Sequence, residues 1–227
     1  MTTLVPRTRA GVAAAALLLV AACGGGSDIP SAAEDEAAAQ KVVLSSADLP
    51  GYTQEPLDPD ESSSAIDRCV ANNPLLSVED NPRGVSGADF TKDDKNVQVQ
   101  SGAMFAEKEA DARKAFSDIQ AALSSQCLKD EMRKTLEEAV DPGVVVRTVS
   151  AQTLPAPGGT DQSVASRVTV PLESEDERLT VYADLTFLRQ GRGLAGVFTL
   201  QAGSPFPDAE RTRLGEVVGD RLSEHVS

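Results

Sequence analysis

Cysteine is the most reactive residue type in this chain, and the surroundings of Cys23 predict its chemistry. The residues before it have a basic start, with Arg7 and Arg9, followed by an apolar run over 10–22. This run is shorter than the ~20 residues that a helix needs to cross a bilayer. A basic start, a short apolar run and small residues before a break are typical of an export signal. We therefore expect residues 1–22 to be a cleaved signal peptide.

The residues Val20, Ala21, Ala22 and Cys23 resemble the lipobox of bacterial lipoproteins. The resemblance implies cleavage directly before Cys23 and attachment of diacylglycerol, with acyl chains such as palmitate, to its thiol. Two or more acyl chains anchor a protein stably, whereas one binds a membrane marginally. We expect a protein held on the extracytoplasmic face of the cell membrane by lipid on Cys23. The alternative is an ordinary secreted protein with a chance cysteine near its cleavage site.

The segment after Cys23 predicts a spacer. Residues 24–28 are glycine, serine and aspartate, a flexible composition. Residues 30–40 are mostly alanine and acidic residues, which fits either a tether or a solvated helix. We favour a tether over 23–40 that becomes helical near 37–44, followed by a single domain over 41–227.

Cys69 and Cys127 are the two cysteines that remain if Cys23 carries lipid. In an exported protein, such a pair is more often joined as a disulfide than left as two free, buried thiols. The loop that the bond would close has about 58 residues. The chain-entropy model gives roughly 4 kcal/mol of stabilisation for a loop of this length. We predict a structural disulfide.

Catalytic and metal-binding patterns are missing from the sequence. The only histidine, His225, is the third residue from the end, and the common nucleophile, phosphate-binding and zinc motifs do not occur. The acidic residues at 173–177 lie in a polar loop, where a solvated surface is the expected role. We predict no catalytic residues, no metal and no cofactor, and an envelope hydrolase is the least favoured function.

The composition argues against several classes of binding partner. The formal net charge of −14 becomes −16 when Arg7 and Arg9 leave with the signal peptide. Such a charge repels nucleic acid and anionic surfaces. The chain has no Trp and two Tyr, which argues against a sugar-stacking or single-strand nucleic-acid surface.

Hydrophobic periodicity predicts an α+β fold. Alternation over 97–105 indicates a strand, and an apolar stripe within 107–139 indicates a long helix that carries Cys127. Four further strands are expected around 144–152, 164–172, 178–190 and 194–202, and a last helix begins near Pro207. We predict roughly five strands in a mainly antiparallel sheet, with the long helix and the C-terminal helix packed on one face.

One row of side chains in this sheet is a candidate binding site. Tyr182, Asp184 and Thr186 alternate with the apolar residues of the strand around 178–190, on the face away from the predicted core. The three side chains would either line a groove or form a plain solvent-facing row.

The order of these parts resembles a known group of proteins. The residues that carry the resemblance are the lipobox, "LSSADLP" at 44–50, the two cysteines, "GRGLAGVFTL" at 191–200 and "DAERTRLGEVVGDRL" at 208–222. They resemble exported actinobacterial lipoproteins related to the extracellular sensor domain of PknH-type receptor kinases. A less specific resemblance is to PsbP/Mog1-like lipoproteins.

The resemblance implies an antiparallel sheet with flanking helices, disulfides, a cleft suspected of ligand binding, and no established catalytic residues. The sensor domain typically has two disulfides, whereas this chain has cysteines for only one. The favoured function is thus a membrane-anchored, non-catalytic, ligand-binding or sensor-like domain, with a small molecule or a lipid as ligand. The alternative is an accessory subunit that docks on a protein complex of the cell envelope.

Overall fold

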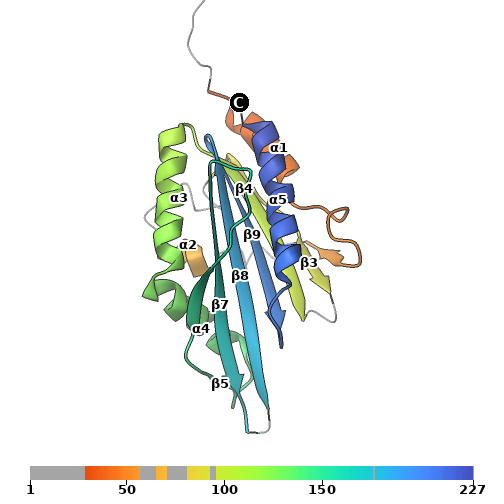
Figure 1. Cartoon of the computed structure of the whole chain (residues 1–227), viewed down its shortest axis with the longest axis vertical. Helices are drawn as coiled ribbons and strands as arrows, with labels where there is room; N and C mark the ends of the chain where they lie inside the picture. The colour runs from red at the N-terminus through yellow and green to blue at the C-terminus, as the bar shows by residue number, and fades with distance from the viewer. Residues whose placement is uncertain (1–28, 57–64, 71–80, 93–95, 176, 227) are drawn as a thin grey trace, which may run out of the picture.

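The computed structural model of the protein describes residues 29–56, 65–70, 81–92, 96–175 and 177–226. An antiparallel sheet with helices against it forms the molecule (Figure 1), so the α+β class predicted from the sequence is confirmed. The predicted signal peptide, Cys23 and the glycine-rich spacer lie outside the described residues. None of the described helices is both long and apolar enough to span a membrane.

The described residues form nine strands in one sheet, where five were predicted. The order across the sheet is β1-β3-β4-β9-β8-β7-β5, with β2 paired to β4 and β6 paired to β7. The strands are β1 (Thr53–Glu55), β2 (Gly84–Ser86), β3 (Asp89–Lys92), β4 (Val97–Phe105), β5 (Val145–Val146), β6 (Ser150–Leu154), β7 (Gln162–Glu173), β8 (Arg178–Gln190) and β9 (Gly193–Ala202).

The extra strands are short ones that alternation does not detect. β1, β2 and β3 have three or four residues each, too few for a period of two to stand out. The segment predicted as one strand over 144–152 is divided into β5 and β6. The long strands β4, β7, β8 and β9 lie where the sequence predicted strands.

Five helices are described: α1 (Ala32–Val42), α2 (Ala65–Cys69), α3 (Glu109–Leu123), α4 (Gln126–Ala139) and α5 (Asp208–His225). They cover both faces of the sheet (Figure 1), so the prediction that the helices pack on one face is wrong. The helices α3 and α4 share one apolar core with Val181, Ala183 and Leu185 of β8. The helices α1 and α5 share a second core with Leu188 of β8. Successive side chains of a strand point to opposite faces, so β8 contributes to both cores.

The long helix predicted over 107–139 is two helices. Ser125 lies between α3 and α4 and caps α4, because its Oγ accepts a hydrogen bond of 3.2 Å from the Leu128 amide. The same hydroxyl donates to the carbonyl of Ala122 at 2.7 Å. Serine side chains compete for backbone partners in this way and favour caps over helix interiors, so the chain turns here.

Helix α1 begins at Ala32, earlier than the start near 37 that the sequence predicted. Its first turn has a capping box: the Ser31 hydroxyl accepts from the Glu34 amide, and the Glu34 carboxylate accepts from the Ser31 amide at 2.8 Å. The helix buries Asp35, Ala39 and Val42. The segment is therefore a packed part of the fold from Ala32 onward.

Strand β8 is joined to its two neighbours by turns at opposite ends of the sheet. The turn end is the two-residue turn Gly191–Arg192 that joins β8 to β9, where Gly191 has a φ of 51°. The last turn of α5 packs closely on it, since a Cβ on Gly193 would lie 2.7 Å from Leu222. The tip end is the opposite end of β8, where the turn after Glu173 joins β7 to Arg178.

Candidate functional site

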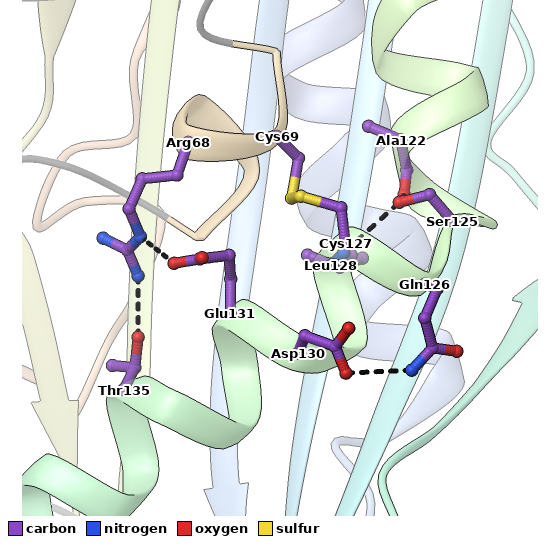
Figure 2. The surroundings of a disulfide bond; sticks show 10 residues. All are labelled: Arg68, Cys69, Ala122, Ser125, Gln126, Cys127, Leu128, Asp130, Glu131 and Thr135. Carbon is purple, nitrogen blue, oxygen red and sulfur yellow. Dashed lines mark hydrogen bonds and ion pairs between the residues drawn. A yellow bond between two sulfur atoms is a disulfide. The ribbon is translucent and has the colours of Figure 1, made fainter.

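The disulfide predicted from the sequence is present between Cys69 and Cys127, whose Cα atoms are 5.8 Å apart. Figure 2 shows that it joins the end of α2 to the first turn of α4. Cys127 therefore belongs to α4, and it does not continue the apolar stripe of α3 as the sequence predicted. Arg68 strengthens the same junction through an ion pair with Glu131 and a hydrogen bond of 2.7 Å to Thr135.

A hollow of about 390 Å³ lies beside this disulfide. A salt bridge of 2.8 Å joins Lys114 to Asp118 within its wall. The two sulfur atoms are oxidised, so neither offers a thiol nucleophile here. The lining residues are Cys69, Val70, Lys114, Asp118, Ala121, Ala122, Ser125 and Cys127.

The row Tyr182, Asp184 and Thr186 is divided by α5. Asp184 and Thr186 are each 1% exposed, and they lie on the face that α5 covers, whereas Tyr182 is half-buried. The last two side chains of the row therefore do not face solvent. Only Tyr182 keeps access to a partner.

Asp184 is the centre of a buried ion cluster beneath α5. Arg167 lies opposite it on β7 and forms two hydrogen bonds, Nε to Oδ1 at 2.6 Å and Nη2 to Oδ2 at 2.7 Å. These hydrogen bonds outweigh burial and raise the pKa of Arg167, so its charge is secure. From α5, Arg211 places its Nε 3.7 Å from Asp184 Oδ2 and donates to the Pro155 carbonyl at 2.9 Å.

This cluster attaches α5 to the sheet, and sequence reasoning missed it. The cluster has two buried arginines and one buried aspartate. A second carboxylate, Asp208, lies 3.2 Å from Arg167 and is 70% exposed. The available signal was that Arg167 and Asp184 each interrupt an apolar strand. Once these strands pair, the two residues can neutralise each other.

Beyond the first turn of α5, the same face of the sheet has no helix over it in the described part of the chain (Figure 1). Cross-strand pairs place Thr169 beside Tyr182, Pro171 beside Thr180 and Glu173 beside Arg178. Paired residues of an antiparallel sheet point to the same face. Together with Arg147 these residues form a surface that we call the open face; its members are Arg147, Thr169, Pro171, Glu173, Arg178, Thr180 and Tyr182.

Two arginines converge on one carboxylate in the open face. Arg147 Nε donates to Glu173 Oε2 at 2.7 Å, and Arg178 Nη2 donates to Oε1 at 3.0 Å. The hydrogen bonds from Arg147 and Arg178 lower the pKa of Glu173, which is therefore ionised at neutral pH. The side chain of Arg178 is 84% exposed and that of Arg147 is 56% exposed. The group has one more positive than negative charge, on a chain whose net charge is −14.

A hollow of about 350 Å³ lies at the tip end, beside the open face. It combines the arginines with apolar atoms of Pro171, Leu172 and Leu179. Leu179 and Val145 are exposed by 38% and 48%, and the third large exposed apolar residue that is described is Ile29. Guanidinium groups beside apolar surface suit a partner that presents carboxylates and apolar side chains.

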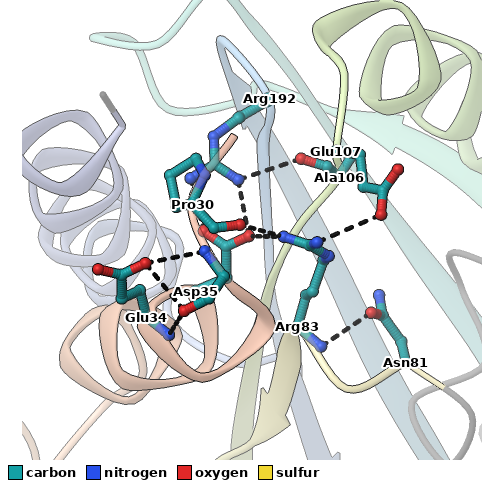
Figure 3. A network of polar contacts seen from close by, with 9 residues as sticks. Pro30, Glu34, Asp35, Asn81, Arg83, Ala106, Glu107 and Arg192 are labelled. Atoms are coloured by element: carbon teal, nitrogen blue, oxygen red, sulfur yellow. Dashed lines mark hydrogen bonds and ion pairs between the residues drawn. The ribbon is translucent and has the colours of Figure 1, made fainter. Parts of the chain in front are cut away.

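A second ion cluster lies at the turn end (Figure 3). Asp35 of α1 is 1% exposed and accepts from Arg192 through both oxygens, at 2.5 and 2.9 Å, and from Arg83 at 2.5 Å. Arg83 also donates to the Pro30 carbonyl at 2.8 Å. The guanidinium of Arg192 lies 5.1 Å from the ring centroid of Phe105. The cluster joins α1 to the turn between β8 and β9.

Asp35 stands among other acidic residues in an alanine-rich segment, and its residue type alone does not predict this role. The capping pattern Ser31-x-x-Glu34 was the available signal, because it places a helix start three residues before Asp35.

Among the described residues, no group of three or more His, Cys, Asp or Glu side chains is arranged to hold a metal ion. His225 is the last residue of α5 and is half-buried.

No protein-family model and no curated protein matches the chain. The structure is similar to the crystal structure of the extracellular domain of PknH from Mycobacterium tuberculosis, with a TM-score of 0.45 and 10% sequence identity. The match covers 84% of this chain and 95% of that chain.

Proposed function

We propose that the protein is a non-catalytic binding module, anchored to the extracytoplasmic face of the membrane through lipid on Cys23, which docks on an envelope protein through its open face. The partner would present an acidic segment with apolar side chains. This proposal combines the sensor-like and the accessory-subunit functions that the sequence suggested.

One observation carries the docking site: α5 covers only part of its face of the sheet. Asp184 and Thr186 are buried beneath the helix, while Tyr182, Thr180 and Arg178 continue the same row beyond it. The uncovered part carries two exposed arginines on a strongly acidic chain. Arginine binds carboxylates in a two-pronged geometry. Glu173 holds both guanidinium groups in place before a partner arrives.

The shape of the hollow favours a macromolecule over an enclosed small ligand. Its volume of about 350 Å³ is within the ~300–1,000 Å³ range of small-molecule pockets. Such pockets, however, bury roughly 70–90% of the ligand surface, whereas this hollow lies along the surface of two strands and their edge. A protein segment laid across the strands would contact more of this hollow than a lipid or a metabolite would.

Site-specific photo-crosslinking in the native cells tests the docking site. A photo-reactive residue in place of Thr180 should give one discrete protein adduct, while the same residue at the exposed Gln120 of α3 should not. Arg178→Glu should reduce the Thr180 adduct at least fivefold. The matched control is Arg113→Glu, which makes the same charge change at another exposed arginine paired with a glutamate, and it should leave the adduct unchanged.

Adducts of equal yield at positions 180 and 120 would contradict docking through the open face. So would an equal loss of the Thr180 adduct in Arg178→Glu and in Arg113→Glu. Thermal stabilisation by an envelope metabolite or lipid would instead support the small-ligand function. A ligand at a hundred times its dissociation constant should add about 2.7 kcal/mol to the free energy of unfolding. Intact-mass analysis of membrane-extracted protein tests the anchor separately, because Cys23→Ser should abolish both the lipid mass and the membrane association.

A further inference from the structure

We propose that Glu55 of β1 and Asp89 of β3 form a binding site for a divalent cation, and for calcium in particular. The two residues lie on neighbouring strands at one edge of the sheet, where β3 is labelled in Figure 1. The open face lies toward the other end of the strand order, on β7 and β8. The proposal therefore depends neither on a docking partner nor on the lipid anchor.

The pairing of β1 with β3 places the two carboxylates side by side. Glu55 lies directly opposite Asp89 in the antiparallel register. The side chains of such a pair point to the same face, with their Cβ atoms about 4.5–5.5 Å apart, and like charges in this position repel each other. The pairing is unfavourable unless a positive charge lies near both residues.

Asp89 is also buried, with an exposed fraction of 7%. Its Oδ2 accepts a hydrogen bond of 3.2 Å from Gln98 Nε2 of β4. Its Oδ1 is buried without a hydrogen-bond partner, and no ion pair in the described part of the chain includes this carboxylate. Buried charges are normally paired or coordinate a metal ion, and a buried polar atom without a partner points to a water or an ion.

The free oxygen of Asp89 belongs to the side where Glu55 lies. Strand β3 stands between β4 and β1. Gln98 occupies the β4 side of the Asp89 carboxylate and leaves the β1 side to Oδ1. A cation bound to Oδ1 and to the Glu55 carboxylate would satisfy the buried oxygen and offset the repulsion between the two acids.

The lysine of β3 does not supply this positive charge. Phe90 belongs to the apolar core that α1 and α5 share. Successive side chains of a strand point to opposite faces, so Lys92 lies on the face of Phe90 and Asp89 lies on the other. Lys92 Nζ is 5.6 Å from the ring centroid of Tyr52. The basic side chain of β3 is thus directed away from the two carboxylates.

The oxygens on this face suit calcium. Ca²⁺ takes about six to eight oxygen ligands from carboxylates, amide carbonyls and water, whereas Mg²⁺ demands a near-ideal octahedron. Gln98 offers its Oε1, and Thr91 Oγ1 lies 3.5 Å from Glu55 Oε1 and helps to position that carboxylate. The described residues place no third acidic group here, so water completes the coordination. The sequence predicted no metal, because no local motif joins residues 55 and 89.

Calcium titration tests the site. Equilibrium dialysis in about 0.1 M NaCl should show one bound Ca²⁺ with a dissociation constant of about 10⁻⁴–10⁻³ M, the range of extracellular calcium modules. Asp89→Asn should weaken this binding at least tenfold. In urea unfolding, about 10 mM CaCl₂ should raise the ratio of folded to unfolded wild type by about 10- to 100-fold. NaCl added to the same ionic strength should not.

The metal-free protein gives the sharpest comparison. With EGTA present, Asp89→Asn should unfold at a higher urea concentration than the wild type, because its amide can accept from Gln98 and donate to Glu55 without repulsion. With calcium present, this order should reverse. Asp111→Asn removes an exposed carboxylate of α3 and is the matched control; it should leave the calcium response unchanged.

Glu55→Gln is a second variant, for use if Asp89→Asn does not fold. Glu55 is half-buried on a strand of three residues, and its replacement should also abolish the calcium response. A wild-type urea midpoint that calcium leaves unchanged would overturn the proposal. So would a calcium response that Asp89→Asn or Glu55→Gln retains in full.

Discussion

Arg192 and Asp35 lie 157 residues apart in the chain and form a buried, two-pronged ion pair, with distances of 2.5 and 2.9 Å between the guanidinium nitrogens and the carboxylate oxygens. The pair connects the first turn of α1 to the turn between β8 and β9 (Figure 3). Arg83 shares the same carboxylate. One aspartate thus binds two arginines at the point where the predicted tether meets the fold, and Glu107 gives Arg83 a second carboxylate at 3.2 Å.

Replacement of Asp35 by asparagine should destabilise the protein strongly. The substitution leaves Arg83 and Arg192 without their shared anion, and loss of one partner from a buried ion pair typically costs about 3–5 kcal/mol. Urea unfolding of the two proteins measures the difference. Glu36→Gln, an exposed carboxylate on the same helix, is the control and should change the free energy of unfolding by less than about 0.5 kcal/mol. Similar effects of the two variants would contradict the role of Asp35.

Replacement of Asp184 should lower the free energy of unfolding by a similar amount, and a second substitution should restore much of the lost stability. Asp184→Leu leaves Arg167 and Arg211 buried without their central carboxylate, so we expect a loss of about 3–5 kcal/mol in the free energy of unfolding. The double variant Arg167→Met, Asp184→Leu removes the main pair together and should recover more than half of that loss. A double-mutant cycle in urea measures the coupling. Additive losses would show that the two residues act independently.

Reduction of the Cys69–Cys127 disulfide should lower the free energy of unfolding by about 4 kcal/mol, since the bond spans a sequence separation of 58 residues. Unfolding of the wild type with and without a reducing agent measures this value. The variant Cys69→Ser, Cys127→Ser should match the reduced wild type and should not respond to the reductant. A change below about 1 kcal/mol would mean that the buried surface between α2 and α4 already holds this junction.

The sequence predicted those parts of the fold whose residues alternate or recur clearly. Strand β4 buries every second residue from Val97 to Phe105, and that alternation was visible in the sequence. The two cysteines could be paired because an exported chain with one remaining pair has one pairing available. These predictions needed only local pattern or simple counting.

The parts that could not be predicted depend on pairing between distant charged residues. Asp35, Arg167 and Asp184 are polar, and a polar residue is normally exposed. Each is buried here because a partner from another element neutralises it, and no local pattern specifies that partner. For the same reason, the sequence did not predict that β8 is covered on both faces. Asp184 and Thr186 suggested a solvent-facing row, whereas α5 covers them. The open face could be found only once the extent of α5 was known.

The carboxylate of Asp48 should make the free energy of unfolding depend on pH in the acid range. Burial raises the pKa of Asp48, but hydrogen bonds from Arg221, at 2.7 and 3.0 Å, and from Ser45 outweigh it, so the net pKa is lowered. A carboxyl whose pKa is lower in the folded state stabilises the fold above its unfolded pKa, near pH 4. That contribution is lost as the pH falls through the lower, folded value.

Asp48→Asn should therefore be less stable than the wild type at pH 7 and at pH 5, and the gap should narrow as the pH falls below about 4. Urea midpoints measured at pH 7, 5 and 3 follow this gap. Asp220→Asn makes the same chemical change at an exposed position of α5 and should lower the urea midpoint less than Asp48→Asn does at pH 7. If the gap for Asp48→Asn instead widened toward pH 3, the carboxylate of Asp48 would be destabilising the folded protein, and its contacts with Arg221 and Ser45 could not be what fixes the loop after α1 to α5.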